Sequence, residues 1–150
     1  MTGSAYHNGR WRLSAIVAVS LGTGLALGVW TTRGSAEMAV PTEHKGVEVV
    51  PIGVIGETSM TAQIGLAGYV LQLREITIEP GGQIAQHSHA NRPGLVKVLS
   101  GTWLEGRASG ETPYSPDSGG LLEDENTVHW FFNTGDEPAT AIVCDIVPAS

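Results

Sequence analysis

Glycine and proline are spread densely along this chain, and they limit it to short regular segments. Its 150 residues include 20 glycines and 8 prolines. Both residue types are unfavourable inside helices and mark turns. No stretch of useful length has the 3.6-residue apolar period of an amphipathic helix. The sequence therefore predicts short strands joined by turns. A hydrophobic content of 41% is too high for a disordered chain, and the length suits one domain with a tail.

The first 36 residues have the pattern of an export signal. Arg10 and Arg12 precede an uncharged apolar run over residues 13–30, and small residues follow at 34–36. A positive start, an apolar middle and a small-residue end are typical of a signal peptide, and a run of this length could also remain as a membrane anchor. We therefore expect an exported protein, periplasmic, secreted or membrane-anchored. Contact with a membrane is expected only through residues 13–30, if they are not cleaved.

Charge and cysteine content exclude several classes of protein. Eight Lys and Arg against 15 Asp and Glu give a formal charge of −7. A nucleic-acid binder would carry clustered basic residues, so no nucleic-acid partner is expected. The single cysteine, Cys144, excludes an intramolecular disulfide and a cysteine-rich zinc module.

Alternating apolar residues predict at least eight strands after a linker over residues 37–46. A shift of alternation between Leu73 and Ile76 predicts a β-bulge near Arg74. Segments 58–68 and 108–120 are polar and rich in turn residues, so we expect loops there, and a turn over 80–82. Many short strands favour a sandwich or barrel, with a domain over residues 47–148. The expected strands cover residues 47–55, 69–79, 84–89, 95–99, 102–107, 121–123, 128–133 and 140–147.

Three of the five histidines form a candidate metal site. His87 and His89 are two residues apart, so on a strand both rings point to the same side. His129, from a distant strand, would complete a set of three. Imidazole nitrogens suit divalent transition metals such as Fe, Mn, Ni, Cu and Zn. Without a third partner, a His-x-His pair is more often two hydrogen-bonded histidines on a strand.

The surroundings of these histidines resemble the two motifs of the cupin superfamily. Gly81 is followed by five residues and then His87-Ser88-His89, and the segment closes at Gly101. The second motif is matched by the residues HWFFN, from His129 to Asn133. The resemblance implies an all-β fold, the cupin double-stranded β-helix or jelly-roll barrel, over about residues 43–147. It also implies His87, His89 and His129 as metal ligands.

The sequence departs from the first motif at the metal-ligating glutamate. Gly94 stands where the motif has Glu. One interpretation is a three-histidine centre, similar to those of thiol dioxygenases and some diketone-cleaving dioxygenases. In a second, another carboxylate substitutes, and Glu123 is preferred to Glu105 because it shares strand parity with His129. In a third, there is no metal. The second motif also departs from its pattern, with Ser118, Asp124 and Asn126 in place of Gly, Pro and Gly.

The remaining candidates surround the histidines. Glu123 is the one candidate catalytic residue, as a general base. Arg92, in the loop after His89, could meet a carboxylate substrate, although a solvated loop arginine is the more ordinary role. Packing inside the barrel and at its mouth is expected of the aromatic residues Trp103, Trp130, Phe131 and Phe132.

Together these features predict an exported cupin-domain protein that binds a divalent transition metal and acts on a small molecule as an oxygenase. The alternative is a non-catalytic module that captures a small ligand or a metal ion. A third hypothesis is an interaction protein. The resemblance implies a homodimer, because cupins often pair through edge strands.

Overall fold

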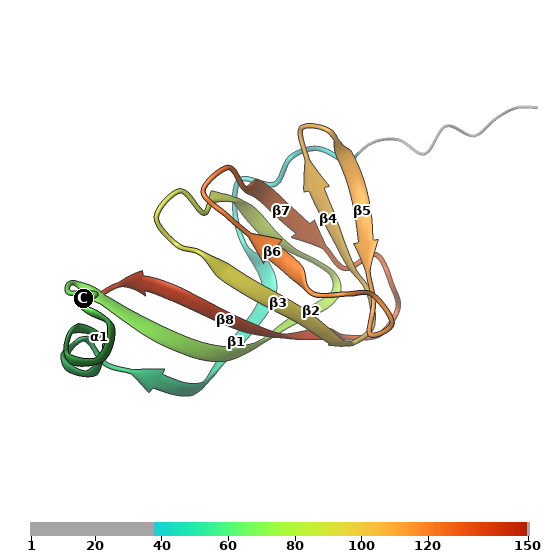
Figure 1. Cartoon of the computed structure of the whole chain (residues 1–150). Helices are drawn as coiled ribbons and strands as arrows, with labels where there is room; N and C mark the ends of the chain where they lie inside the picture. The colour runs from blue at the N-terminus through green and yellow to red at the C-terminus, as the bar shows by residue number, and fades with distance from the viewer. Residues whose placement is uncertain (1–37, 150) are drawn as a thin grey trace, which may run out of the picture. The chain divides into compact units, whose positions relative to one another are not determined.

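The computed structural model describes residues 38–149, and within them the protein is all-β apart from one short helix (Figure 1). The all-β prediction is therefore confirmed. The segment predicted as signal peptide or anchor lies outside the described residues. Among residues 38–149, no helix is long and apolar enough to cross a bilayer. The elements are β1 (Lys45–Ile55), α1 (Glu57–Ile64), β2 (Tyr69–Ser88), β3 (Gly94–Ser100), β4 (Trp103–Arg107), β5 (Gly110–Tyr114), β6 (Leu121–Glu123), β7 (Val128–Phe132) and β8 (Ala139–Pro148).

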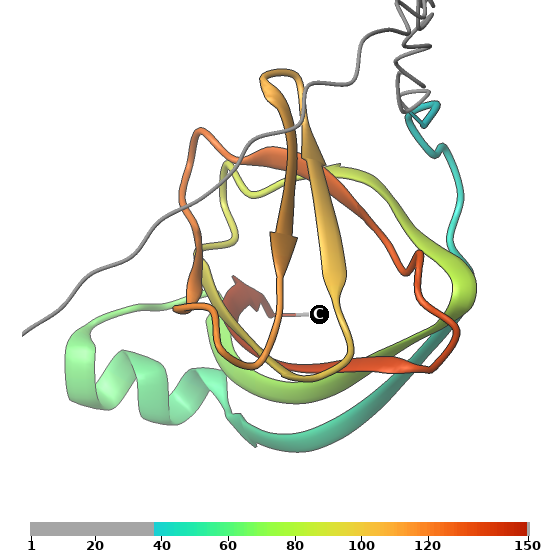
Figure 2. The ribbon, with the colours of Figure 1, turned by 90° about the vertical axis from the view of Figure 1, so that its right-hand side faces the viewer.

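The eight strands form one antiparallel sheet that curls around its own core. The strand order is β5-β4-β7-β2-β8-β3-β6, and β1 pairs with β2 outside this path. The long strand β2 joins the two halves, since residues 69–78 pair with β8 and residues 83–88 pair with β7. Viewed along the barrel, the ribbon encircles the core (Figure 2). Curling brings strand ends that are distant in sequence to one region, and the histidines lie there.

The core follows the two-residue alternation of the strands. Along β8, residues 139, 141, 143 and 145 are buried, and their neighbours are half-buried. The first three are the apolar side chains Ala139, Ala141 and Val143, and the fourth is Asp145. A charged residue thus occupies an inward position at the end of an apolar row. The other core side chains include Ile76, Ile78, Ile84, Val96, Val98, Trp103, Leu121 and Phe131.

Strand β2 differs from the prediction in two ways. It continues through residues 80–82, where we expected a turn, and Gly81 has φ +68° at this bend. The predicted bulge within this strand near Arg74 is wrong, because the β2–β8 register runs without a shift from Tyr69 to Ile78. A register shift does lie opposite Arg74, but it is on β1, between Pro51 and Gly53. The alternation breaks for another reason: Arg74 lies two residues before Ile76, opposite the inward-facing Val143, so its side chain takes an inward position.

Two predicted loops contain regular structure. Helix α1 begins at Glu57, one residue before the predicted loop 58–68, and ends inside it at Ile64. It buries one side chain, Met60, so it has no apolar stripe that would indicate a helix. The C-terminal end of the helix does have a sequence signal, because Gly65 is a left-handed C-cap with φ +71°. Strand β5 lies within segment 108–120 and pairs with β4 as a hairpin. The first strand also begins early, at Lys45, inside the segment expected as a linker.

Asn133, the last residue of the HWFFN segment, holds the turn that follows β7. Its side-chain amide donates to the carbonyl oxygens of Ile78 and Glu137, both at 2.8 Å, and its Oδ1 accepts from the Gly135 N–H at 2.9 Å. The side chain is buried, so these bonds satisfy groups that water cannot reach. Asn133 therefore has a structural role beside the histidines.

Candidate metal centre

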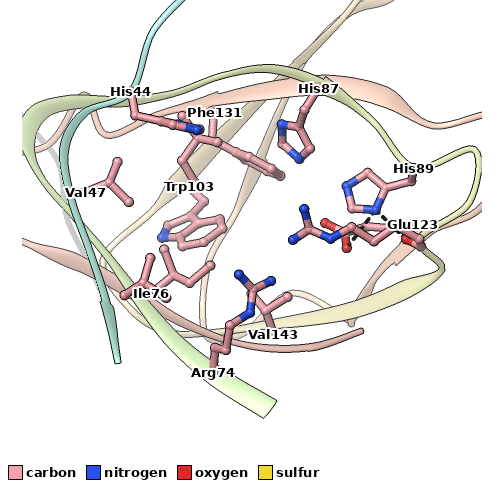
Figure 3. Close-up of a pocket in the computed structure, with 13 residues that line it drawn as sticks. His44, Val47, Arg74, Ile76, His87, His89, Trp103, Glu123, Phe131 and Val143 are labelled. Atoms are coloured by element: carbon pink, nitrogen blue, oxygen red, sulfur yellow. Dashed lines mark hydrogen bonds and ion pairs between the residues drawn. The ribbon is translucent and has the colours of Figure 1, made fainter. Parts of the chain in front are cut away.

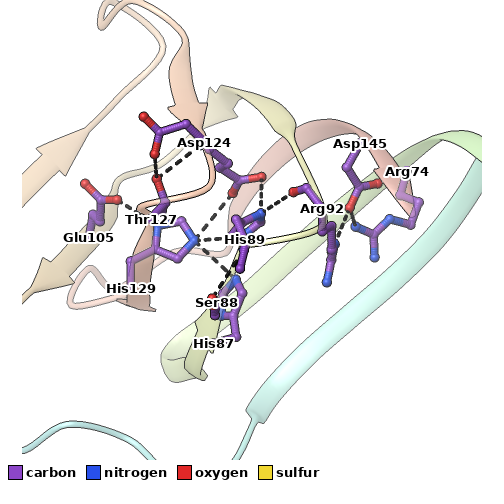
Figure 4. A network of polar contacts seen from close by, with 12 residues as sticks. Arg74, His87, Ser88, His89, Arg92, Glu105, Asp124, Thr127, His129 and Asp145 are labelled. Carbon is purple, nitrogen blue, oxygen red and sulfur yellow. Dashed lines mark hydrogen bonds and ion pairs between the residues drawn. The ribbon is translucent and has the colours of Figure 1, made fainter. Parts of the chain in front are cut away.

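Strand pairing brings the three predicted histidines together. His87 on β2 lies directly opposite His129 on β7, and His89 follows β2 on the same side. The Nε2 atom of His129 lies 3.2 Å from Nε2 of His87 and 3.1 Å from Nε2 of His89. Three ring nitrogens thus converge on one point, and one potential ligand atom from each residue lies within 4.8 Å of the others. Figure 4 shows this convergence.

The opposite ring nitrogens fix which tautomer each histidine takes. Nδ1 of His87 lies 2.9 Å from the Ala85 carbonyl oxygen, and Nδ1 of His89 lies 2.7 Å from that of Arg92. Nδ1 of His129 lies 2.7 Å from Oε1 of Glu105. Since these partners are acceptors, each Nδ1 carries the ring proton and donates it. Each Nε2 is then left with a lone pair that faces the other two.

Burial favours the neutral form of His87 and His89. Desolvation lowers the pKa of His87 to about 4, although its bond to the Ala85 carbonyl works against the shift. The pKa of His89 is also lowered, again chiefly by burial. Neutral imidazole is the form that binds metal ions. The Nε2 lone pair of His129 faces those of His87 and His89 at 3.2 and 3.1 Å without a proton between them, and such a site attracts a cation.

Glu105 lies behind His129 and outside the converging Nε2 atoms. Its Oε1 accepts from His129 Nδ1 and from Nε of Arg107, each at 2.7 Å. Burial raises the pKa of Glu105, but these two bonds prevail and lower it overall. The carboxylate is therefore ionised. It holds the ring of His129 in place through Nδ1. Glu105 therefore does not supply the carboxylate ligand that is missing at Gly94.

Glu123 reaches the cluster from β6. Its Oε1 lies 3.5 Å from Nε2 of His129, and its Oε2 lies 3.4 Å from Nδ1 of His89. The Nδ1 proton of His89 already points to the Arg92 carbonyl, so Oε2 is buried with no hydrogen-bond partner among the described residues. Burial raises the pKa of Glu123 to about 7. An orphaned buried carboxylate beside three lone pairs adds to the need for a cation.

Gly94 makes the space that this carboxylate occupies. It pairs with Glu123 on β6 and with Asp145 on β8, so three inward positions lie side by side across the strands. A Cβ atom on Gly94 would collide with Oε2 of Glu123 and lie 3.3 Å from Cβ of Asp145. Position 94 on β3 lacks a carboxylate side chain, but the carboxylate of Glu123 lies directly across from it on β6.

A cavity of about 320 Å³ opens beside the histidines (Figure 3). His87, His89 and Glu123 lie at one end, and its walls include the apolar side chains of Ile76, Trp103, Phe131 and Val143. The indole of Trp130 lies on the other side of β7, where only a glycine at position 106 leaves it room. Of the predicted aromatic residues, Trp103 and Phe131 thus face the cavity.

Two polar residues that line the cavity were not among the predicted site residues. His44 lies at the cavity mouth, in the segment expected as a linker, and its Nδ1 accepts the Ala85 N–H at 3.1 Å. Arg74 projects from β2 into the cavity (Figure 3). The break in alternation at Arg74 was the available signal. The predicted Arg92 also lines the cavity.

Comparisons with known proteins identify the fold. No protein-family model matches the chain, and a comparison with curated proteins finds no match. Among solved structures, the chain is similar to the Cupin_2 domain of an XRE family transcriptional regulator from Enterobacter cloacae. The TM-score is 0.53 at 18% identity, and the match covers 70% of this chain and 100% of that one.

Two further solved structures are similar in fold to the chain. A predicted oxalate decarboxylase from Thermotoga maritima has a TM-score of 0.52 at 16% identity, with 72% of this chain and 93% of that one covered. The protein TT1209 from Thermus thermophilus has a TM-score of 0.51 at 15% identity, with 68% and 83% covered. At these identities the likeness concerns the fold, and the resemblance that the two motifs indicated is confirmed at that level: the chain has the cupin fold, with three clustered histidines inside its barrel.

Proposed function

We propose that this protein is a metal-dependent cupin that binds one divalent transition metal through His87, His89 and His129. The observation that carries the proposal is the convergence of three unprotonated Nε2 atoms. Nitrogens bound at about 2.1 Å to one ion lie roughly 3.0 Å apart at right angles and roughly 3.4 Å apart at tetrahedral angles. The separations of 3.1 and 3.2 Å between these atoms fall between those limits. Fe, Mn, Ni, Cu and Zn all suit this donor set.

We propose Glu123 as a fourth ligand of this centre. Its Oε1 lies 3.5 Å from Nε2 of His129, nearly as close as the other two imidazole nitrogens. Its orphaned Oε2 also supports a role in which the carboxylate is neutralised by a cation. This role differs from that of a free general base, since a carboxylate bound to an ion is a weaker proton acceptor.

We propose that the activity is oxygenation of a small organic molecule in the cavity. The bound ion would supply Lewis acidity and open coordination positions at the end of that cavity. The chain's own residues hold the imidazoles in one tautomer and surround the site with apolar walls that limit water. One observation favours the alternative, a binding module without turnover: every histidine Nδ1 is engaged, so no free base lies in the cluster once Glu123 binds the ion.

Metal analysis and oxygen uptake test the proposal together. Full-length protein purified without chelators should contain close to one transition-metal ion per chain. Protein reloaded with Fe(II) should then be screened for oxygen uptake against a panel of small organic molecules. Absence of bound metal would overturn the metal centre. If the protein binds metal but its Fe(II)-reloaded form takes up no oxygen with any molecule of the panel, the oxygenase is overturned and the binding module remains.

Replacing Glu105 with glutamine should weaken metal binding without removing a ligand. Glu105 accepts the Nδ1 proton of His129, which orients the ring and makes its Nε2 more basic. Loss of such an outer partner typically lowers metal affinity roughly 10- to 100-fold. Competitive titration against a chromophoric chelator measures the change. Glu111→Gln, an exposed carboxylate on β5, is the matched control and should leave the affinity unchanged.

Metal affinity should also depend on pH through Glu123. With its pKa raised to about 7 by burial, Glu123 carries a proton below that pH, and this proton must leave before the carboxylate binds an ion. Affinity should therefore rise about tenfold per pH unit from pH 5 towards 7 and then level off. The pKa of His87, at about 4, lies below this window. Titrations at several pH values measure the slope. A Glu123→Gln variant that retains the full slope would contradict the assignment.

We propose that the domain acts outside the cytoplasm, on the basis of the apolar run at 13–30 and the small residues at 34–36. Mass spectrometry of protein from the native host should find a chain that begins near Glu37. A full-length mature chain would instead favour the anchor. The expected homodimer also stays a prediction.

A further inference from the structure

Two arginines in the cavity share one carboxylate oxygen. Nη2 of Arg74, from β2, lies 2.8 Å from Oδ2 of Asp145 on β8, and Nε of Arg92 lies 2.6 Å from the same oxygen. Asp145 is fully buried, with 0% of its side chain exposed, whereas the side chains of Arg74 and Arg92 are 17% and 32% exposed. Both arginines line the cavity that holds the histidines, and Figure 4 shows them meeting at Asp145.

This arrangement leaves guanidinium N–H groups without acceptors and positive charge without a matching anion. A guanidinium has five N–H donors, and among residues 38–149 each of these two side chains makes one hydrogen bond, to Asp145. Nε of Arg74 and Oδ1 of Asp145 are buried without any partner in that part of the chain. Glu123, the other acid that lines the cavity, contacts His89 and His129 and is ion-paired with neither arginine in the described part of the chain. Within the ion-paired group, two guanidiniums therefore face one carboxylate, and a partly desolvated positive charge is costly unless an anion completes the group.

The excess charge faces apolar walls and lies near the proposed metal centre. Ile76, Trp103 and Phe131 border the same cavity, and Arg74 points into it (Figure 3). The backbone carbonyl of Arg92 holds Nδ1 of His89, which keeps this arginine close to the cluster. At about 320 Å³, the cavity is at the small end of ligand sites. Its occupant therefore combines a compact apolar body with one anionic group.

We infer that the cavity binds a small organic acid, with its carboxylate between the guanidiniums of Arg74 and Arg92 and its apolar part against Trp103 and Phe131. A planar carboxylate matches the planar fork of a guanidinium. This inference names the substrate class of the proposed metal-dependent activity and rests on that function for its catalytic meaning. The binding itself needs no metal, so the two can fail separately.

Calorimetric titration of the metal-free full-length protein tests the site. Benzoate and acetate are the probes, benzamide is the uncharged match to benzoate, and phosphate is the inorganic anion. Benzoate should bind at least tenfold more tightly than benzamide, because the amide cannot neutralise the arginines. Phosphate should bind more weakly than benzoate, since it gains nothing from the apolar walls. Equal binding of benzoate and benzamide, or preference for phosphate, would overturn the inference.

Variants separate this site from the metal centre. Arg74→Gln and Arg92→Gln should each lower benzoate affinity at least tenfold, and Arg74→Lys, which keeps the charge, should lose less than Arg74→Gln. Lys97→Gln is the control, because Lys97 is exposed on β3 and binds the Pro116 and Ser118 carbonyls instead. Metal stoichiometry should be unchanged in every variant. Unaltered benzoate affinity in both glutamine variants would overturn the inference, whatever the metal content.

Discussion

Replacing His129 with alanine should abolish stoichiometric metal binding. Its Nε2 is the nitrogen from which the other two are 3.1 and 3.2 Å away, so the variant keeps only a pair of imidazoles. We expect the affinity to fall by more than about 100-fold, beyond the effect of losing an outer hydrogen-bond partner. Elemental analysis of the purified variant and competitive titration measure the loss.

His129 is fully buried, so its removal leaves a cavity, takes away one of the two partners of Glu105 and weakens the fold. His87→Ala is the second test, since His87 is only half-buried and its loss disturbs less packing. The control is His44→Ala, a histidine at the cavity mouth outside the cluster, which should bind metal like the wild type. Circular dichroism checks that each variant is folded. Full occupancy in a folded His87→Ala or His129→Ala protein would refute the three-histidine centre.

Replacing Gly94 with alanine should weaken metal binding as much as replacing Glu123 with glutamine. The added Cβ would collide with Oε2 of Glu123 and displace the carboxylate from the centre. We expect each single variant to lose affinity at least about tenfold, the scale of one charge-assisted contact. The double variant should be no worse than Glu123→Gln alone, because both changes remove the same interaction. Competitive titration of all four proteins completes the cycle.

Gly94→Glu distinguishes an occupied position from a vacant one. If the carboxylate position of the first motif were empty, the new glutamate would add a ligand and tighten metal binding. Because Glu123 already lies there, the two carboxylates should compete, and Gly94→Glu should bind metal no better than Gly94→Ala. Gly94 lies in an extended strand and is not among the glycines with positive φ, so backbone strain does not confuse the comparison. Gly119→Ala, with open space around its Cβ, is the control. Tighter binding by Gly94→Glu would refute the role of Glu123.

Local sequence signals were sufficient for most strands and for the histidines. Turn residues and two-residue alternation predicted the strands that became β3, β4, β6, β7 and β8, because both depend on neighbouring residues. The His87–His89 spacing placed both rings on one face for the same reason. Helix α1 was not predicted, because a short helix with one buried residue has no apolar period. The break in alternation at Arg74 was visible but ambiguous, since a bulge and an inward-facing arginine give the same pattern.

The sequence by itself determined the strand-rich fold and the three-histidine candidate, whereas the tertiary structure decided which charged residues surround them. Gly94 and Glu123 are adjacent only through the β3–β6 register, and Arg74 reaches Asp145 across 71 residues of chain. A shift of one residue in either pairing would turn these side chains to the opposite face. Register depends on the packing of the whole barrel, so no local pattern could assign Glu123 to the histidines or Arg74 to the cavity.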